Sequence, residues 1–316
     1  MSIVLQAAKF QDPDVTATGA RRAFVDLVSL NTLWFNTGTL CNIECHGCYI
    51  ESSPANDRLS YIRASEVETY LDEITELGWS TEEIGFTGGE PFMNPEIVEM
   101  VGASLGRGFR VLILTNAMQP MLRPHLRAGL LELLGEYGGR LVLRVSLDHF
   151  TAEKHEVLRG PGTWERTLDG LRWLAASGFA LNVAGRTCWS EPEAELRAGF
   201  ARLFEGEGVA IDAECPASLV LFPEMDLSVE VPEITVDCWH ILGKRPEEVM
   251  CATSRMVVKR RGSQRPSVVA CTLIPYDPRF EMGETLAEVD GAVKLNHPHC
   301  AKFCVLGGGS CSVARG

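Results

Sequence analysis

Short apolar runs alternate with longer stretches whose apolar residues recur at helical spacing along most of the chain. The short runs have the length and apolar character of strands, and the longer stretches have the pattern of amphipathic helices. The pattern therefore predicts strands at residues 32–35, 83–87, 110–115, 141–147, 180–187 and 209–212.

Capping residues mark the ends of the helices between these strands. Ser65 and Glu68 have the pattern of a capping box, and Gly78 is suited to closing the same helix. A later helix is predicted over residues 164–176, where leucines recur at helical spacing and Gly178 lies just past the end. Strands and capped helices thus follow one another regularly.

Strands spaced roughly 30 residues apart have the separation that a strand-helix-strand unit requires. A series of such units predicts an α/β fold with a parallel sheet, either open and doubly wound or curled into an incomplete barrel. In both architectures, functional residues belong at the carboxyl ends of the strands. The residues at or just beyond these ends are Cys41, Gly88, Asn116, Asp148 and Arg186.

The alternation stops after about Cys215, where prolines become frequent. Residues 256–258 and 267–271, on either side of a turn at Gly262, have the pattern of a β-hairpin. We therefore expect an N-terminal segment, a sheet-and-helix domain and a small hairpin-containing extension. Their predicted bounds are 1–31, 32–234 and 235–316.

Composition argues against several classes of function. The 316 residues carry a formal net charge of −13, whereas a nucleic-acid groove needs concentrated Lys and Arg. No stretch approaches the roughly 20 apolar residues of a membrane span, and the N-terminus lacks the features of a secretion signal. Eleven cysteines without such a signal indicate a reducing compartment, where thiols bind metals. We expect a cytoplasmic protein that binds neither nucleic acid nor membranes.

Three cysteines, Cys41, Cys45 and Cys48, lie in one short loop after the first predicted strand. Three thiolates in one loop can hold three irons of a four-iron cluster and leave the fourth iron without a protein ligand. An open metal position is where chemistry takes place, as in catalytic zinc sites. A zinc knuckle or three unrelated buried thiols are the alternatives, but zinc more often takes two separated pairs of ligands. The spacing favours an iron–sulfur cluster.

A glycine pair with a carboxylate, Gly88-Gly89-Glu90-Pro91, follows the second predicted strand. Paired glycines let a ligand approach the backbone closely and expose amide and carbonyl groups. A carboxylate beside them suits an ammonium group, whereas a tight turn without a ligand is the alternative. The position of the pair one strand after the cysteine loop favours a binding role.

With these two motifs in this order, the sequence resembles the radical S-adenosylmethionine (radical SAM) superfamily. The resemblance continues through Leu114-Thr115-Asn116 and the segments 144–148 and 158–164, and it covers residues 32–212. It implies a partial (β/α)6 barrel, similar to an incomplete TIM barrel, with a cluster in the loop after the first strand.

The resemblance also implies the cofactors and the roles of several residues. A [4Fe–4S] cluster would chelate the amino and carboxylate groups of S-adenosylmethionine (SAM) and cleave it reductively to a 5′-deoxyadenosyl radical, which abstracts hydrogen from a substrate. The segment that would hold the SAM amino group is Gly88, Gly89, Glu90 and Pro91. The candidates for its carboxylate and ribose are Ser146, Asp148 and Asn116. A guanidinium fits the carboxylate bidentately, and the candidate arginines, for which a salt bridge is the alternative role, are Arg159, Arg166 and Arg186.

One departure from the family pattern concerns the residue before the third cysteine. That residue is usually aromatic in the family and contacts the adenine, whereas here it is Gly47. Either the backbone alone contacts the adenine, or His46 or Tyr49 supplies the aromatic ring. The shape of the pocket at this point is therefore left open, but the cluster ligands are not affected.

The cysteines nearer the C-terminus form a second group, before and after the predicted hairpin. Their arrangement resembles the twitch extension, a shortened relative of the SPASM domain, which holds an auxiliary [4Fe–4S] cluster. The candidate ligands are Cys251, Cys271, Cys300, Cys304 and Cys311, with Cys238 as a sixth candidate. Zinc is the alternative occupant, with His297 and His299 available as nitrogen ligands.

The expected function is that of a radical SAM enzyme that oxidises or cross-links a small metabolite with the help of an auxiliary cluster. Only a short segment precedes the first strand, so we expect no separate leader-binding domain of the kind found in many peptide-modifying relatives. The alternatives are a maturase for a ribosomally made peptide or a partner protein, and a non-catalytic metal-binding or electron-transfer protein. An external reductant such as flavodoxin or ferredoxin is an expected partner. Cys188 and Cys215 are either hydrogen donors to a substrate radical or ordinary buried thiols.

Overall fold

The computed structural model describes residues 9–225 and 229–309. Its centre is a parallel sheet in which each strand pairs with the next one along the chain, as Thr32 does with Glu83 and Val183 with Leu219. The strands are Thr32–Asn36 (β2), Glu83–Thr87 (β3), Arg110–Thr115 (β4), Leu141–Ser146 (β5), Ala180–Arg186 (β6) and Leu219–Phe222 (β7). The predicted α/β class is confirmed.

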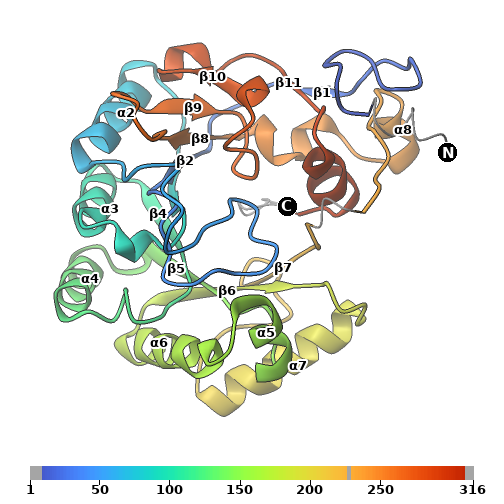
Figure 1. Ribbon diagram of the computed structural model, residues 1–316. Helices are drawn as coiled ribbons and strands as arrows, with labels where there is room; N and C mark the ends of the chain where they lie inside the picture. The colour runs from blue at the N-terminus through green and yellow to red at the C-terminus, as the bar shows by residue number, and fades with distance from the viewer. Residues whose placement is uncertain (1–8, 226–228, 310–316) are drawn as a thin grey trace.

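Helices connect these strands and cover the outer, convex side of the curled sheet (Figure 1). They are Ala64–Glu76 (α2), Ile97–Gly106 (α3), Pro124–Tyr137 (α4), Ala152–Arg159 (α5), Thr163–Ser177 (α6) and Glu193–Glu207 (α7). Because the sheet curls and carries its helices on one side, the architecture is a partial barrel rather than an open, doubly wound sheet.

The C-terminal part of the chain continues the same sheet. Ser254–Val258 (β8) pairs in parallel with β2, and Ser267–Val269 (β9) and Glu281–Gly283 (β10) follow in antiparallel order. The strand order of this nine-stranded sheet is β10-β9-β8-β2-β3-β4-β5-β6-β7. The predicted hairpin is therefore present, and it extends the barrel sheet at the β2 edge.

Smaller elements complete the extension. Phe24–Val25 (β1) pairs with Val293–Lys294 (β11) in a separate antiparallel ribbon. The short helix Cys238–Leu242 (α8) and a π-helix over Cys300–Leu306 lie on the open side of the curled sheet (Figure 1). π-Helices are rare and occur frequently at functional sites.

Two apolar cores hold these parts together. In the main core, helices pack on the barrel sheet, as Leu71 and Ile74 of α2 do around the stacked rings of Phe35 and Phe86, which lie 5.7 Å apart. A second core contains residues of the N-terminal segment and of the extension. The segments predicted as separate parts at 1–31 and 235–316 thus share one core.

Two local predictions were wrong. Residues 209–212 do not form a strand, and the strand that pairs with β6 is β7, which begins at Leu219, ten residues later than predicted. The run at 209–212 directly follows α7, and its Asp212 side chain accepts a hydrogen bond from the Glu214 amide, which starts a turn instead. The capping box of α2 lies at Arg63 and Glu66 rather than at Ser65 and Glu68, because Glu66 accepts the Arg63 amide at 2.9 Å.

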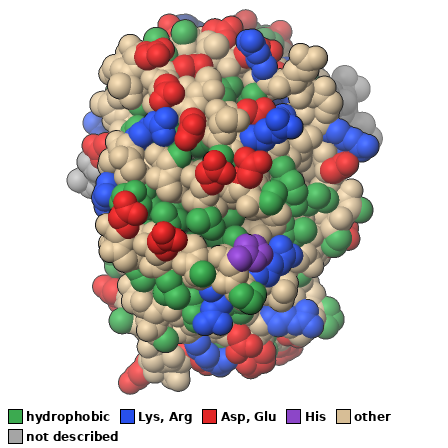
Figure 2. Space-filling model, turned by 90° about the vertical axis from the view of Figure 1, so that its left-hand side faces the viewer, with side chains coloured by type: hydrophobic (Ala, Val, Ile, Leu, Met, Phe, Trp, Pro, Cys, Tyr) green, Lys and Arg blue, Asp and Glu red, His purple; other side chains and the backbone are tan. Residues whose placement is uncertain are grey.

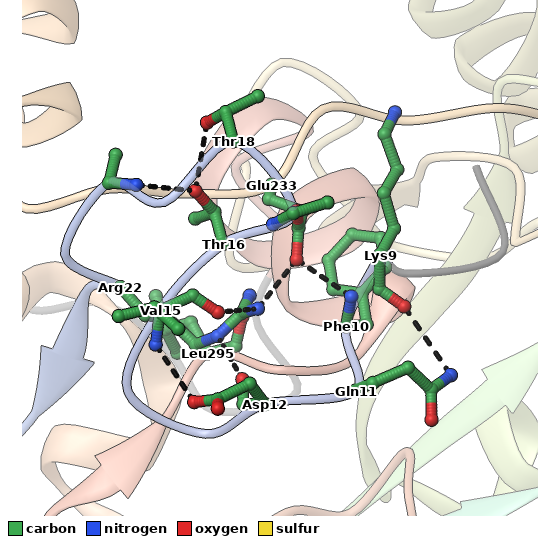
Figure 3. Close-up of polar contacts among 12 residues, drawn as sticks. Lys9, Phe10, Gln11, Asp12, Val15, Thr16, Thr18, Arg22, Glu233 and Leu295 are labelled. Atoms are coloured by element: carbon green, nitrogen blue, oxygen red, sulfur yellow. Dashed lines mark hydrogen bonds and ion pairs between the residues drawn. The ribbon is translucent and has the colours of Figure 1, made fainter. Parts of the chain in front are cut away.

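A buried ion pair ties the N-terminal segment to the segment after β7 (Figure 3). The Arg22 guanidinium lies 2.5 Å from the Glu233 carboxylate, and the two side chains are 0% and 5% exposed. Glu233 also accepts the Phe10 amide at 2.7 Å and the Ala17 amide at 2.6 Å. Both charges are therefore paired and hydrogen-bonded, which is the condition under which buried charges are tolerated.

The outer helical face carries charges of both signs. Figure 2 shows Asp and Glu interspersed with Lys and Arg on the side of the molecule where α2, α3 and α4 lie. Arg107, at the end of α3, pairs with Asp72 of α2 at 2.9 Å on this outer surface. Among the described residues, no helix combines the length and the apolar character that crossing a bilayer requires.

Candidate active site and second cysteine site

One cavity lies at the carboxyl ends of the parallel strands, under the loop that carries the first three cysteines. Most of the residues predicted for the site line it, as the topology requires. They are Cys41, Cys45, Cys48, Gly88, Gly89, Asn116, Ser146, Asp148, Arg159 and Arg186. Glu90 and Pro91 are buried but do not line the cavity, and Arg166 is exposed on α6 away from it.

The cysteine loop is held at both ends and at its tip. Its first cysteine, Cys41, donates its amide to the Ser53 carbonyl at 3.1 Å, and the His46 amide donates to the Leu158 carbonyl of α5 at 2.7 Å. Gly47 adopts a left-handed backbone with φ of 69°. An aromatic residue would be strained there, which gives a backbone reason for the glycine before the third cysteine.

The three thiols fit an iron–sulfur cluster as a donor set. They are free of disulfides and face one cavity. Burial, with the nearby Glu90 carboxylate, raises the pKa of the Cys41 thiol to about 12, and burial also raises the pKa of Cys45. Thiolates at these positions therefore need a cation beside them, which iron supplies.

The glycine pair is explained first by close packing of backbones. A Cβ at Gly89 would lie 2.1 Å from the Leu40 carbonyl oxygen, and one at Gly88 would lie 2.6 Å from the Gly38 carbonyl oxygen. The Gly89 amide also donates to the Gly38 carbonyl at 2.8 Å. The pair thus lets the cysteine loop lie directly on the end of β3, and it leaves the edge of both glycines exposed to the cavity.

Glu90 supports the site from behind. Its carboxylate accepts hydrogen bonds from the Thr115 hydroxyl at 2.9 Å, the Asn116 amide at 2.8 Å and the Phe92 amide at 3.2 Å. Burial raises the pKa of Glu90 to about 7, although these hydrogen bonds oppose the shift. The carboxylate therefore fixes the end of β4 to the glycine turn rather than pointing into the cavity.

Asp148 and Arg159 form a bidentate pair in the cavity wall. The distances from the guanidinium to the two carboxylate oxygens are 2.6 and 3.2 Å, and the side chains are 7% and 13% exposed. Burial raises the pKa of Asp148, but the charges of Arg159 and then Arg186 outweigh it, so the net shift is downward. For Arg159, the structure supports the alternative role of a salt bridge.

Arg186 differs from Arg159 because its guanidinium makes no ion pair with any of the described residues. It lines the cavity from the end of β6, and its Nε is buried without a hydrogen-bond partner among the described residues. Its own amide donates to the Asp148 carbonyl at 2.9 Å, which fixes the backbone at this point. Of the three candidate arginines, Arg186 is the one left available for an anionic ligand.

An apolar wall closes the cavity opposite the glycine pair, and sequence reasoning missed most of it. Leu273 and Phe303 come from the extension, and Phe222 and Met225 from the end of β7 and the segment after it. Tyr49, considered above for the adenine, lines the same cavity. These residues lie far apart in sequence, and only the packing of the extension against the barrel mouth brings them together.

The second cysteine site lies inside the extension. Cys251, Cys271, Cys300 and Cys304 line one small apolar cavity. The first two flank the β8–β9 hairpin, and the last two stand on the π-helix. Burial raises the pKa of Cys300 well above its ordinary value, and Cys271 and Cys251 raise it further because they lie nearby. Of the five candidate cysteines that lie within the described residues, these four line one cavity.

The remaining candidates lie elsewhere or beside this group. His299 lines the same cavity, and burial lowers its pKa to about 4, so its imidazole is neutral at physiological pH. The residues that do not line it are Cys238 and His297, and Cys311 lies outside the described residues. Cys188 and Cys215 do not line the first cavity. Within the described ranges, no three His, Cys, Asp or Glu side chains are grouped closely enough to hold a single metal ion.

Comparison with known proteins agrees with this geometry. The model of the radical SAM superfamily matches residues 35–188, which run from β2 through the cysteine loop to the end of β6. Residues 35–188 are a radical SAM domain. The resemblance and the partial-barrel fold predicted from the sequence are thus confirmed.

Two relatives match the radical SAM domain in sequence. The antilisterial bacteriocin subtilosin biosynthesis protein AlbA of Bacillus subtilis is 31% identical over 145 residues, which are 46% of this chain and 30% of AlbA. The AdoMet-dependent heme synthase of Methanosarcina barkeri is 30% identical over 149 residues, which are 45% of this chain and 38% of the synthase. The chain therefore spans only about a third of the length of each of these relatives.

A solved structure extends the likeness of fold beyond the radical SAM domain. Streptococcus suis SuiB bound to S-adenosylmethionine superimposes with a TM-score of 0.58 over 81% of this chain and 63% of SuiB, at 12% identity. Radical SAM enzymes use a [4Fe–4S] cluster and SAM, and their SPASM-type members carry auxiliary clusters. The predicted class of cofactors is therefore confirmed for the radical SAM domain.

Proposed function

We propose that the chain is an enzyme that cleaves SAM reductively and removes hydrogen from a substrate bound under the apolar wall. Cys41, Cys45 and Cys48 would hold the cluster. When bound, this group supplies the electron that splits SAM into methionine and a 5′-deoxyadenosyl radical, which takes a hydrogen atom from the substrate. The observation that carries the proposal is the convergence of three thiols and the unpaired Arg186 on one cavity.

The surrounding residues would orient SAM in this cavity. The exposed edge of Gly88 and Gly89 suits the amino group, because its carbonyl groups can accept hydrogen bonds. Arg186 suits the carboxylate, since a guanidinium binds a carboxylate bidentately. The Ser146 hydroxyl, at the end of β5, suits the ribose. Glu90 and Asp148 would act on SAM only indirectly. The carboxylate of Glu90 already binds the end of β4, and that of Asp148 already binds Arg159.

The second cysteine site would hold an auxiliary cluster on Cys251, Cys271, Cys300 and Cys304. A cubane takes four thiolates, and the cavity offers four in an apolar shell that excludes water. Leu273 lines both cavities, which places the second site directly behind the wall of the first. This arrangement supports a net oxidation or cross-link, in which the auxiliary centre accepts an electron from the substrate.

For the substrate we propose the side chain of a peptide. AlbA is a bacteriocin biosynthesis protein, and SuiB has been solved with its precursor peptide SuiA. The wall of Phe222, Leu273 and Phe303 suits an apolar side chain rather than a highly charged metabolite. A small metabolite, as first predicted, is the second candidate, because the heme synthase matches the same domain at similar identity.

The test uses the full chain, reconstituted anaerobically with iron and sulfide and reduced by dithionite or a flavodoxin system. We expect formation of 5′-deoxyadenosine from SAM, and loss of this activity without reductant. The short peptide encoded nearest the gene is then added, and its mass is measured. Loss of a pair of hydrogen atoms supports a peptide substrate. An unmodified peptide beside active SAM cleavage contradicts it, and absence of SAM cleavage contradicts the enzyme itself.

A further inference from the structure

Arg255 is a fully buried arginine in the extension that forms no ion pair within the described residues. It lies on β8, opposite Leu33 of β2, and its relative exposure is 0%. An arginine stays protonated in proteins, so this position carries a positive charge in the interior. Burying a charge is costly unless the charge is paired and hydrogen-bonded.

The hydrogen bonds of Arg255 all go to main-chain carbonyl groups. Its guanidinium donates to the Cys251 carbonyl at 2.5 Å, the Ser254 carbonyl at 2.9 Å, and the Val289 carbonyl at 3.1 and 3.2 Å. These bonds satisfy its donors but supply no negative charge. No carboxylate among the described residues lies within ion-pair distance of it. The exposed Asp290 acts on its charge only from further away.

The buried Arg22 provides a comparison. Arg22 is equally buried, and it too donates to main-chain carbonyls, but it faces the Glu233 carboxylate at 2.5 Å (Figure 3). The fold thus places an acid in contact with one buried guanidinium, whereas the other has only the more distant charge of Asp290. A closer negative charge would offset the cost of burying Arg255.

The second cysteine site lies next to Arg255 and can supply that charge. Arg255 holds the carbonyl of Cys251, the first thiol of the site, and its charge interacts electrostatically with both Cys251 and Cys271. Four thiolates carry more negative charge than a zinc ion or an oxidised four-iron cluster carries positive charge. A centre of either kind on these thiols is therefore an anion in an apolar cavity.

We propose that Arg255 is the countercharge of a four-thiolate metal centre on Cys251, Cys271, Cys300 and Cys304, and that it raises the reduction potential of that centre. This inference rests on the part of the proposed function that assigns a metal to these thiols. A fixed positive charge near the centre favours its reduced form, which is the more negative one. Arg255 is thus a positioning residue, because it acts on the centre through charge and through the Cys251 backbone.

The test compares Arg255→Lys, Arg255→Gln and the control Arg22→Gln in the reconstituted full chain. Iron, sulfide and zinc are counted per chain, and the second centre is titrated reductively while its electron paramagnetic resonance signal is recorded. The control removes an equally buried guanidinium whose partner is Glu233. It is expected to lower stability and leave the potential of the second centre unchanged.

We expect Arg255→Gln to shift the potential of the second centre downward and to release its metal to a chelator several-fold faster. Arg255→Lys keeps the charge and should lie near wild type in both. A centre that holds zinc would overturn the proposal, because zinc has no reduction potential for Arg255 to raise. The proposal is overturned if Arg255→Gln retains wild-type potential and release rate, or if the four cysteines hold no metal. Formation of 5′-deoxyadenosine, measured in parallel, shows whether the barrel site works independently of that outcome.

Discussion

The two cysteine sites of this protein differ in what surrounds their thiols. In the barrel site, three thiols face a cavity. The same cavity is lined by the edge of the glycine pair, by Ser146 and Arg186, and by the apolar wall. The extension site offers four thiols in a small cavity whose other lining residues are apolar except for His299. An incomplete ligand set beside polar groups suits a reacting centre, whereas a complete set in an apolar shell suits a closed one.

The arginines near the two sites show the same difference. Arg186 lines the barrel cavity, and no acid within residues 9–225 and 229–309 pairs with it, so it is available to a ligand that enters. Arg255 does not line the extension cavity, and its guanidinium donates its hydrogen bonds to main-chain carbonyl groups. Only its charge therefore acts on the thiols. In the proposed function, one positive charge would face a ligand that exchanges, and the other would face a centre that stays bound.

The largest expected effect comes from removing one thiol of the barrel site. Cys41→Ala should reduce 5′-deoxyadenosine formation to background, because the buried thiol is one of the three proposed cluster ligands. The metal on the extension cysteines should remain. Cys215→Ala, which removes a thiol outside both cavities, is the control and should keep full activity. A comparable loss of 5′-deoxyadenosine formation in Cys41→Ala and Cys215→Ala would contradict a special role of the barrel thiols.

Removing the charge of Arg186 should weaken SAM binding without removing the cluster. A charge-assisted hydrogen bond contributes about 1.5–3 kcal/mol, so Arg186→Ala should raise the KM for SAM by about tenfold to a hundredfold. Iron content should not change. The matched control is Arg166→Ala on the exposed face of α6, which should leave the KM at the wild-type value. An unchanged KM in Arg186→Ala would assign the carboxylate to another residue.

A methyl group at Gly89 should damage the barrel site by packing alone. The added Cβ would lie 2.1 Å from the Leu40 carbonyl, so the cysteine loop must move. We expect Gly89→Ala to lower the free energy of unfolding by about 1–3 kcal/mol and to reduce iron retention at the barrel site.

Gly135→Ala is the control for this experiment. Gly135 lies on α4 with no atom near its Cβ position, and alanine there should stabilise the helix by about 0.5–1 kcal/mol. Equal stability of the two variants, measured by denaturant unfolding, would show that the loop does not need the close approach at Gly89.

The smallest expected effect concerns the ion pair that fastens the N-terminal segment. Burial raises the pKa of Glu233, but hydrogen bonds from Phe10 and Ala17 and the charge of Arg22 lower it by more, so the net pKa is below 4.5. A lowered carboxyl pKa stabilises the fold above the unfolded value, and this contribution is lost as pH falls through the folded pKa. As the pH falls below about 5, the free energy of unfolding should therefore decrease less in Glu233→Gln than in wild type.

The control for this pH dependence is Glu153→Gln, which changes an exposed carboxylate on α5. Its stability should follow the wild-type pH profile, measured by thermal unfolding at a series of pH values. Parallel pH profiles for wild type and Glu233→Gln would show that the buried ion pair does not contribute to the acid sensitivity of the fold.

Most of the barrel could be predicted from the sequence, because the apolar pattern and the capping residues of each strand and helix lie within that segment. Gly178 ends α6 where the pattern indicated, and β3 and β4 have their predicted bounds. The strand that follows β6 was misplaced because residues 209–212 and β7 are both short apolar runs, and only pairing with β6 distinguishes them. Short runs carry too little local information to decide such a case.

The same distinction applies to the residues of the two sites: some belong to local sequence motifs, and others are brought together only by the fold. The thiols and the glycine pair could be predicted because they form compact motifs, whereas the wall residue Phe303 and the proposed countercharge Arg255 belong to no motif. The different roles of Arg159 and Arg186 depend on whether Asp148 lies within reach, which only the folded chain determines. Burial and partners, rather than residue type, separate these arginines.

The most direct test of the two-site account is the iron and labile sulfide content of the anaerobically reconstituted chain and of two variants. One variant replaces Cys41, Cys45 and Cys48 by alanine, and the other replaces Cys251, Cys271, Cys300 and Cys304. With two four-iron clusters, wild type should hold about eight irons and each variant about four, and only the second variant should still cleave SAM. About four irons in wild type and none in the first variant would contradict the account and leave the barrel cluster alone.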